Sequence, residues 1–235
     1  MVFDIIHNAK LMPMELLMAI CIIITVIVSY LLGSLNFGVI WSKLLYKDDV
    51  RSHGSGNAGS TNMLRNYGKK AAVMTLAGDM LKTAVSCLLG YFLGPEYYCM
   101  YIAGLACMIG HMFPIFFNFK GGKGIACLAM MVLVTDWRVF LFLLFAFVVL
   151  VAGTRYVSLG SVICAMLYPV VLNRMNKTVP FGWLIAFIVA VLIVYMHTEN
   201  IKGLFAGKEN KISFKKKEKA EVVDISENAN DGTAE

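Results

Sequence analysis

Long stretches without a charged side chain dominate this chain. Asp, Glu, Lys and Arg are absent from five of them, which cover residues 16–42, 97–119, 139–154, 156–173 and 178–196. An α-helix needs about 20 apolar residues to cross the ~30 Å hydrocarbon core of a bilayer. Each of these runs therefore predicts a membrane-spanning helix.

Two further segments predict helices less strongly. Residues 71–94 are apolar apart from Asp79 and Lys82. Residues 124–135 would extend only about 18 Å at 1.5 Å per residue, which favours a short or half-buried helix. Five helices is the conservative number, and both additions give about seven. The pattern predicts an all-α integral membrane protein in which some helices are short.

The composition agrees with this class and narrows the chemistry. Hydrophobic residues make up 59% of the chain and charged residues 15%. The six cysteines lie on or near the predicted helices without a C-x-x-C pair, so we interpret them as small apolar residues. The chain has no H-E-x-x-H, no G-x-S-x-G and no H-x-x-x-x-D pattern. We therefore expect no metal, no cofactor and no serine triad.

The net charge of +6 could indicate a nucleic-acid partner, but the distribution of basic residues indicates membrane orientation instead. With seven helices, sixteen of the 21 Lys and Arg residues fall on one side. They are Lys43, Lys47, Arg51, Arg65, Lys69, Lys70, Lys120, Lys123, Arg155, Lys202, Lys208, Lys211, Lys215, Lys216, Lys217 and Lys219. The positive-inside rule then predicts an outside N-terminus and a cytoplasmic C-terminus, and we expect no nucleic acid.

Three unusual polar segments fall on this cytoplasmic side, at residues 53–65, 110–124 and 197–210. Loops that converge on one end of a helix bundle are typical of a site. The alternative for each loop taken alone is an ordinary connector.

The first segment reads HGSGNAGSTNMLR. Its small and polar residues can turn backbone N–H groups, hydroxyls and amides toward one anion. These residues are Gly54, Ser55, Gly56, Asn57, Gly59, Ser60, Thr61 and Asn62. We expect Thr61 or Asn62 to cap a helix that begins at about Met63, and Arg65 to grip two phosphate oxygens. A flexible linker is the alternative.

The second segment contains FKGGKG at residues 119–124. Gly121 and Gly122 allow a ligand to approach the backbone beside Lys123. Gly124 follows the lysine where a Walker A loop has Ser or Thr, so nucleotide hydrolysis is not expected, while phosphate binding stays open. His111 is either an acid–base group or a hydrogen-bonded packing residue, and packing is the preferred interpretation.

In the third segment, His197 and Asn200 are spaced i, i+3 and share one face of a helix end. We expect Glu199 to point away. Glu209 belongs to a glycine-and-charge run that follows. A polar helix end at the membrane surface is the alternative.

Two charges fall inside a predicted helix. Asp79 and Lys82 are also spaced i, i+3, and each would be costly alone in lipid, so we expect an ion pair. Ser161 could reach the same pocket from the cytoplasmic end of the segment 156–173, although small serines also serve helix packing.

Together these motifs are similar to those of the bacterial acyl-phosphate:glycerol-3-phosphate acyltransferases, the PlsY family. The resemblance runs in order from residue 16 to residue 211. It rests on GSLNFGVIWSKL (33–44), HGSGNAGSTNMLR (53–65), DMLK (79–82), GHMFPIFFNFKGGKGIA (110–126), RYVSLGS (155–161) and HTENIKGLFAGKE (197–209). Asn36, Cys127 and Gly203 depart from the family pattern, which often has Pro, Thr and Arg there.

The resemblance implies a multi-pass enzyme of the bacterial inner membrane with its active site facing the cytoplasm. It would transfer a fatty acyl group from acyl phosphate to the 1-hydroxyl of sn-glycerol 3-phosphate, giving lysophosphatidic acid. Membrane lipids and the enzyme that supplies acyl phosphate would be its further partners. Residues 1–211 would form one acyltransferase domain, and 212–235 a charged cytoplasmic tail without fixed structure.

The expected site follows from the motifs and the resemblance. Catalytic roles are expected for His197, Asn200, Lys123 and Ser161. Substrate binding is expected for Ser55, Gly56, Asn57, Thr61, Asn62, Arg65, Gly121, Gly122 and Lys123. Support from behind the site is expected from His111, Asp79, Lys82 and Glu209. We expect His197 to orient the substrate rather than to remove a proton, because no Asp or Glu lies one turn away to hold its ring.

Two other functions would fit a polar membrane pocket. A transporter for an organic phosphate predicts internal symmetry, and the two halves show no repeat. A lipid-phosphate phosphatase needs an attacking nucleophile or metal ligands, whereas the loops supply mainly hydrogen-bond donors.

Overall fold

The structure is a computed structural model that describes residues 13–177, 179 and 181–212. Every regular element in these residues is helical. In chain order they are α2 (Met14–Ser34), α3 (Phe37–Tyr46), η1 (Val50–Ser52), α4 (Ser60–Leu93), α5 (Cys99–Met112), η2 (Ile115–Phe117), α6 (Ile125–Thr135), α7 (Trp137–Thr154), α8 (Val157–Met175), α9 (Gly182–Met196) and α10 (Thr198–Phe205). The tail predicted at 212–235 lies outside the described residues, except for Ile212.

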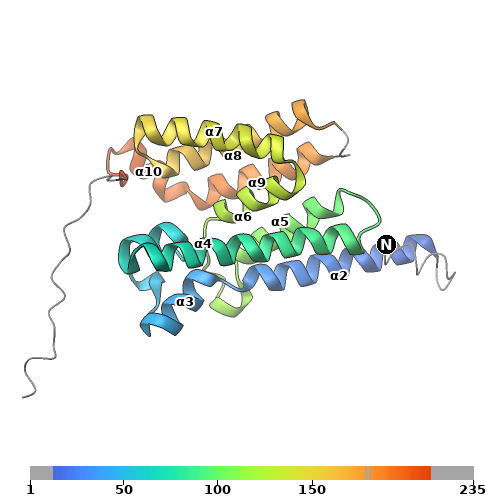
Figure 1. Cartoon of the computed structure of the whole chain (residues 1–235), viewed down its shortest axis with the longest axis horizontal. Helices are drawn as coiled ribbons and strands as arrows, with labels where there is room; N and C mark the ends of the chain where they lie inside the picture. Colours follow the sequence, from blue (N-terminus) through green and yellow to red (C-terminus); the bar gives the residue numbers. More distant parts are fainter. Residues whose placement is uncertain (1–12, 178, 180, 213–235) are drawn as a thin grey trace, which may run out of the picture.

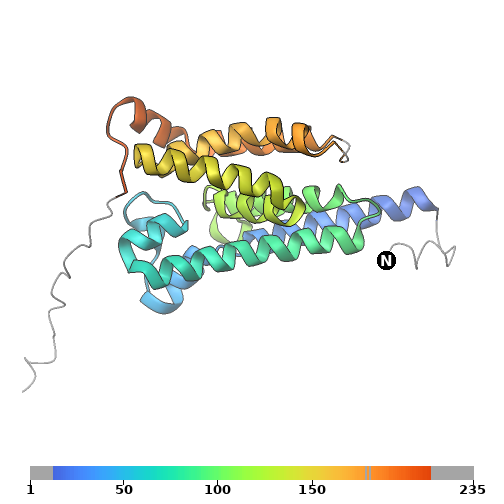
Figure 2. The same cartoon turned by 45° about the horizontal axis from the view of Figure 1, so that its top comes forward.

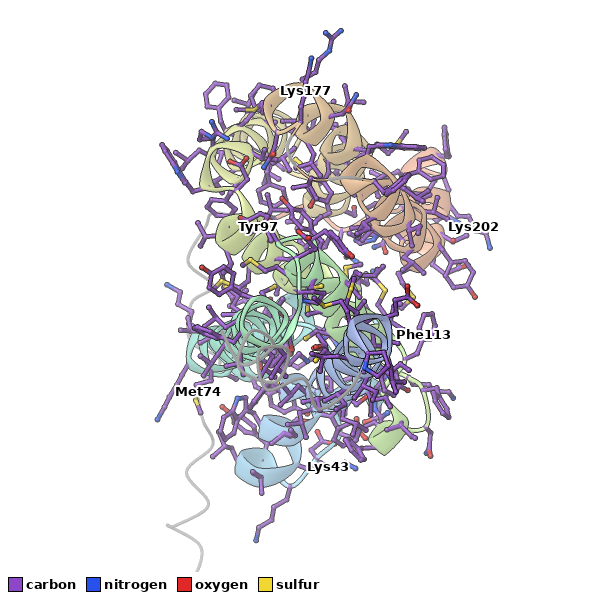
Figure 3. The ribbon with its side chains drawn as sticks, turned by 90° about the vertical axis from the view of Figure 1, so that its right-hand side faces the viewer. Lys43, Met74, Tyr97, Phe113, Lys177 and Lys202 are labelled. Carbon is purple, nitrogen blue, oxygen red and sulfur yellow. The ribbon has the colours of Figure 1, made fainter. Side chains whose placement is uncertain are left out.

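The helices form two groups that run along the same long axis (Figure 1). One group contains α2, α4 and α5, the other α7, α8 and α9, and α6 packs between them against α4, α5 and α7. Figure 3 views the bundle from one end, with Lys43 and Lys177 at opposite extremes. The largest apolar core fills the space around α6 and includes the buried side chains of Tyr101, Met131 and Tyr168.

The prediction of an all-helical membrane protein is confirmed. Five helical stretches in the described residues are long and apolar enough to cross a membrane, and α9 with α10 makes a sixth if this pair, bent by 61°, is one span. The helix expected to be short, α6, is short and has one buried side. All six cysteines are free and buried, as their positions predicted.

Two helix boundaries differ from the prediction. The apolar run 16–42 does not form one continuous helix, because the chain breaks at Leu35–Asn36, where the Asn36 side chain accepts a hydrogen bond from Val39 N at 3.3 Å and caps α3. The segment that seemed weak for its charges, 71–94, belongs to the 34-residue helix α4. An interruption at Gly68, with φ of +82°, separates the first two turns of α4 from its apolar part.

Lys82 explains how α4 tolerates charge in an apolar bundle. Its ammonium contacts Asp79 Oδ1 at 2.8 Å, which confirms the expected ion pair, and both side chains are buried. It also donates hydrogen bonds to the carbonyl oxygens of Gly33 at 2.9 Å and Leu35 at 2.8 Å. The last carbonyls of a helix have no partner within the helix. Lys82 therefore supplies hydrogen bonds to the free carbonyls at the end of α2. These carbonyls in turn lower the free-energy cost of burying its charge.

Glycines let α2 and α5 approach closely where they cross. A Cβ at Gly33 would overlap the Cys107 carbonyl, and a Cβ at Gly110 would overlap the Tyr30 carbonyl. Small residues at such crossings allow backbones to pack directly in membrane helix pairs. The crossing holds the end of α2 within reach of Lys82.

Gly110→Ala should therefore destabilise the protein, because its methyl group forces α2 and α5 apart. Overpacking of this kind costs about 1–3 kcal/mol, which corresponds to a thermal midpoint lowered by roughly 3–10 °C. Gly153→Ala in α7 is the control, since nothing lies within 4 Å of the added Cβ. Thermal unfolding in detergent measures both, and equal midpoints would show that the crossing tolerates a methyl group.

Candidate active site

A cavity of about 520 Å³ brings together the three polar segments that the sequence singled out. Figures 1 and 2 show why they meet: α3, the beginning of α4 and α10 lie at the same end of the bundle, opposite the beginning of α2. The predicted residues that line the cavity are Ser55, Asn57, Thr61, Asn62, Arg65, Asp79, His111, Lys123, Ser161, His197, Asn200 and Glu209. Gly56, Gly121, Gly122 and Lys82 do not line it.

Asn62 organises the first segment from within. Its Oδ1 accepts hydrogen bonds from Ser55 N at 3.1 Å and from Asn66 Nδ2 at 3.1 Å. Its Nδ2 donates to the carbonyls of Val50 and His53, both at 3.0 Å. The buried amide is thus occupied with the loop and holds Ser55 in place.

The expected cap at Met63 is wrong. Helix α4 begins at Ser60 with Gly59 as its N-cap, and no side chain caps it. The Asn57 side chain instead accepts a hydrogen bond from Gly59 N at 3.0 Å, which closes the turn before the helix. Gly59, Ser60 and Thr61 at this uncapped helix start line the cavity.

Arg65 lies one turn into α4 and lines the cavity. Its guanidinium forms no hydrogen bond or ion pair with any residue in the described part of the chain. A cation without a counter-charge at a cavity wall is suited to bind an anionic ligand.

Backbone contacts hold the second segment against the end of α5. Gly121 N donates to the Met112 carbonyl and Gly122 N to the His111 carbonyl, each at 3.1 Å. A Cβ on Gly121 would overlap the His111 carbonyl, so this close approach requires glycine. The two glycines shape the loop that presents Lys123, rather than forming the cavity wall.

Arg51, which the sequence did not single out, ties the turn before the first segment to the second segment. Its Nη1 donates to the carbonyls of Phe117 at 2.8 Å and Lys120 at 3.1 Å. Its Nε and Nη2 donate to the two carboxylate oxygens of Asp49 at 2.9 and 2.7 Å. Main-chain acceptors leave no pattern in the sequence, which is why this link had no signal there.

Lys123 reaches the third segment. Its Nζ donates a hydrogen bond to Asn200 Oδ1. Burial lowers the pKa of Lys123 from its ordinary value; the carboxylate of Glu209 acts in the opposite direction, and the nearby charge of Arg65 adds to the lowering. The side chain is half-buried rather than exposed, so it is held toward the cavity.

Glu209 connects the remaining polar groups. Its Oε1 accepts hydrogen bonds from Asn200 Nδ2 at 2.8 Å and from Ser158 Oγ at 2.9 Å. Glu199 points away, as expected, and pairs with Lys202 at the surface at 2.7 Å. The chain after α10 therefore folds back to complete the wall of the cavity.

His197 lies at the bend between α9 and α10 and is 3% exposed. Its Nδ1 lies 2.8 Å from the Ile193 carbonyl oxygen, which can only accept a hydrogen bond. Nδ1 must therefore carry a proton, and in the neutral ring Nε2 has a free lone pair. The sequence predicted that no Asp or Glu one turn away holds this ring; in the structure the main-chain carbonyl of Ile193 holds it instead.

The rest of the cavity is apolar, which the sequence reading had not anticipated. The side chains come from α4, α6, α7 and α8, and include Leu76, Met80, Leu128, Val132, Phe140, Leu143, Leu144 and Phe147. No group of three or more His, Cys, Asp or Glu residues in the described ranges could hold a metal ion. The cavity thus offers cations and donors in one part and an apolar lining in the other, which suits an amphiphilic phosphate compound.

Comparison with known proteins agrees with this chemistry. Residues 23–207 match the family described as glycerol-3-phosphate acyltransferase. The glycerol-3-phosphate acyltransferase of Coxiella burnetii (strain Dugway 5J108-111) is 38% identical over 193 residues, which cover 81% of this chain and 97% of the relative. The protein of the same name from Bradyrhizobium sp. (strain BTAi1) is 40% identical over 194 residues, or 82% and 96% of the two chains.

Two solved structures share the fold. Both are crystal structures of PlsY, an integral membrane glycerol 3-phosphate acyltransferase. Its glycerol 3-phosphate form has a TM-score of 0.76 and 36% identity, covering 82% of this chain and 96% of that one. Its lysophosphatidic acid form has a TM-score of 0.73 and 35% identity, covering 82% and 95%. The match over most of its length shows that this chain belongs to the glycerol-3-phosphate acyltransferase family and is an acyltransferase.

Proposed function

We propose that this enzyme takes its acyl group from an acyl phosphate and transfers it to the 1-hydroxyl of sn-glycerol 3-phosphate in the cavity described above. The observation that carries the proposal is that one cavity joins Arg65 and Lys123 to a long apolar lining. An acyl phosphate has an anionic head and an apolar chain, and glycerol 3-phosphate adds a second anion. Relatives solved in glycerol 3-phosphate and lysophosphatidic acid forms support this assignment.

The polar part of the cavity binds glycerol 3-phosphate. Arg65 and Lys123 supply the positive charge, and Ser55, Asn57 and Thr61 supply further polar contacts from the first segment. Ser161, His197 and Asn200 approach from α8 and from the bend after α9. Each charge-assisted hydrogen bond contributes about 1.5–3 kcal/mol before costs, so a few suffice for micromolar to millimolar binding.

The apolar part binds the acyl chain. Leu76 and Leu144 line the cavity and are 41% and 42% exposed. The lining therefore continues to the surface that lipid covers, which lets an acyl chain enter from the bilayer.

The reaction requires orientation more than activation, because an acyl phosphate is a mixed anhydride and is already activated for acyl transfer. The 1-hydroxyl oxygen bonds to the carbonyl carbon, the bond to the phosphate oxygen breaks, and the hydroxyl proton ends on the released hydrogen phosphate. His197 Nε2 accepts a hydrogen bond from the hydroxyl and orients it. Asn200 and Lys123 hold the phosphate groups of the two substrates in position relative to each other.

The proposed orientation in the membrane follows from the basic residues at the end of the bundle that contains the site. The five long helices, the bent α9–α10 pair and α6 together make seven membrane helices, with the N-terminus outside and the site facing the cytoplasm of the bacterial inner membrane. The basic residues gathered in the segments around the site support this orientation. The family match over 23–207 supports one acyltransferase domain across residues 1–211.

The donor can be tested with purified protein in detergent and labelled glycerol 3-phosphate. Palmitoyl phosphate should yield lysophosphatidic acid, whereas palmitoyl coenzyme A and palmitoyl acyl carrier protein should not. Product formed only with a thioester donor would show that the assignment of acyl phosphate is wrong.

Lys123→Ala should lower kcat/KM for glycerol 3-phosphate by roughly 10- to 150-fold, the equivalent of one charge-assisted hydrogen bond. Lys120→Ala is the matched control, because Lys120 lies on the same loop but does not line the cavity. Its kcat/KM should stay within twofold of the parent. Equal effects of the two substitutions would mean that the loop contributes only general positive charge.

His197→Asn should mainly raise the KM for glycerol 3-phosphate, because a hydrogen bond that holds the bound substrate is lost while the leaving phosphate still receives the proton. An obligatory base would behave differently, with kcat lower by ~10²–10⁴ and KM little changed. Steady-state kinetics with saturating acyl phosphate separates the two outcomes.

A cysteine introduced at Lys120 should react with a membrane-impermeant maleimide in inside-out vesicles and not in intact cells. The native cysteines are all buried, so the background should be low. Labelling in intact cells would place the site on the outer face and contradict the proposed orientation.

A further inference from the structure

His111 has one ring nitrogen that is occupied and one that hydrogen-bonds to none of the described residues. It lies in the last turn of α5, is 2% exposed, and lines the cavity. Its Nδ1 lies 3.0 Å from the ammonium of Lys82. Its Nε2 forms no hydrogen bond with the described residues. A histidine ring that faces a polar cavity with one free nitrogen is available to a ligand.

The geometry around Lys82 decides which nitrogen of His111 carries the proton. An ammonium has three hydrogens and no lone pair. Three acceptors in hydrogen-bonding geometry surround it: the Gly33 carbonyl, the Leu35 carbonyl and His111 Nδ1. Asp79 contacts Lys82 and His111 as the counter-charge, at 2.8 and 3.3 Å. Nδ1 therefore accepts, and in the neutral ring the proton is on Nε2.

The position of Nε2 indicates what it meets. A Cβ on Gly122 would overlap the imidazole at Nε2, so the ring is in contact with the loop that presents Lys123. The adjoining wall from α4 contains Asp79 between the apolar side chains of Leu76 and Met80. His111 thus lies at the junction of the loop that presents Lys123 and the apolar lining of the cavity. In an acyl phosphate, this junction is occupied by the carbonyl group.

We propose that His111 is a catalytic residue that donates a hydrogen bond from Nε2–H to the carbonyl oxygen of the acyl donor, with Lys82 and Asp79 as positioning residues. The inference rests on the proposed binding of the donor. As the glycerol oxygen bonds to the carbonyl carbon, an electron pair moves onto the carbonyl oxygen, and Nε2–H stabilises that charge. The pair returns when the bond to phosphate breaks, and the proton stays on the imidazole throughout.

A fixed neutral donor is well suited to this role. Donors that are aimed beforehand at a developing oxyanion need no reorganisation during the reaction, and removing one typically lowers kcat by ~10²–10³. Lys82 cannot accept a hydrogen bond, so the ring cannot change tautomer without losing this contact. The competing interpretation is that His111 only packs between Lys82 and the glycine loop.

Two substitutions separate catalysis from packing. Asparagine can place an acceptor near the position of Nδ1, and so keep the partner of Lys82, but it has no group at Nε2. Glutamine extends an amide N–H toward the position of Nε2 but does not reproduce the acceptor. We expect His111→Asn to be the more stable variant and the slower enzyme, with kcat lower by ~10²–10³. His111→Gln should be less stable yet stay within about tenfold of the parent.

The measurements are kcat, the KM for glycerol 3-phosphate and the thermal midpoint. The KM should change little in both variants, since His111 does not contact that substrate. A kcat that follows the thermal midpoint, with Asn faster than Gln, would overturn the proposal. If His111→Asn does not fold, His111→Met replaces it: methionine has the length of glutamine without a donor, and a kcat equal to that of Gln would also overturn the proposal.

The same experiment remains informative if the donor was assigned wrongly. The parent enzyme would then make no product from palmitoyl phosphate, which tests the proposed function alone. The variants would be compared with whichever donor supports turnover, because attack on any acyl donor places charge on a carbonyl oxygen.

Discussion

The buried ammonium of Lys82 is the contact on which the rest of the site depends. A charge inside an apolar bundle is tolerated only where it is paired and hydrogen-bonded. Here the end of α2 supplies carbonyls, α4 supplies Asp79 and α5 supplies His111. Lys82 thereby joins three helices, and the glycines at the crossing of α2 and α5 keep these two helices close together there.

The loops of the site extend outward from this point. The glycine loop hydrogen-bonds to the end of α5, and Arg51 joins it to the loop that begins the first segment. Asn62 holds that loop from the other side. With the loops held by these contacts, Arg65 has no counter-charge among the described residues, and Lys123 hydrogen-bonds to Asn200. These are the groups that an anionic substrate needs.

Much of this arrangement could be predicted from the sequence, for identifiable reasons. Apolar runs predict the spans because few polar side chains are tolerated in lipid. The i, i+3 spacing of Asp79 and Lys82 predicts their ion pair. The convergence of three polar segments followed from the positions of the basic residues. The break at Asn36, the start of α4 at Ser60 and the role of Arg51 did not follow. Asn36 is a favourable N-cap residue, but it lies inside a continuous apolar run, and α4 begins at Ser60 without a side-chain cap. The partners of Arg51 in the second segment are carbonyls distant in the chain, which leave no local pattern.

The tautomer of His197 has the same origin, since the carbonyl of Ile193 determines it. A backbone oxygen is present whatever residue occupies position 193. Alanine scanning around the site would therefore register nothing at the group that prepares this imidazole, and a survey of side chains would underestimate how strongly the ring is constrained. The constraint comes from the backbone at the bend between α9 and α10, so only a change in backbone conformation there would remove it.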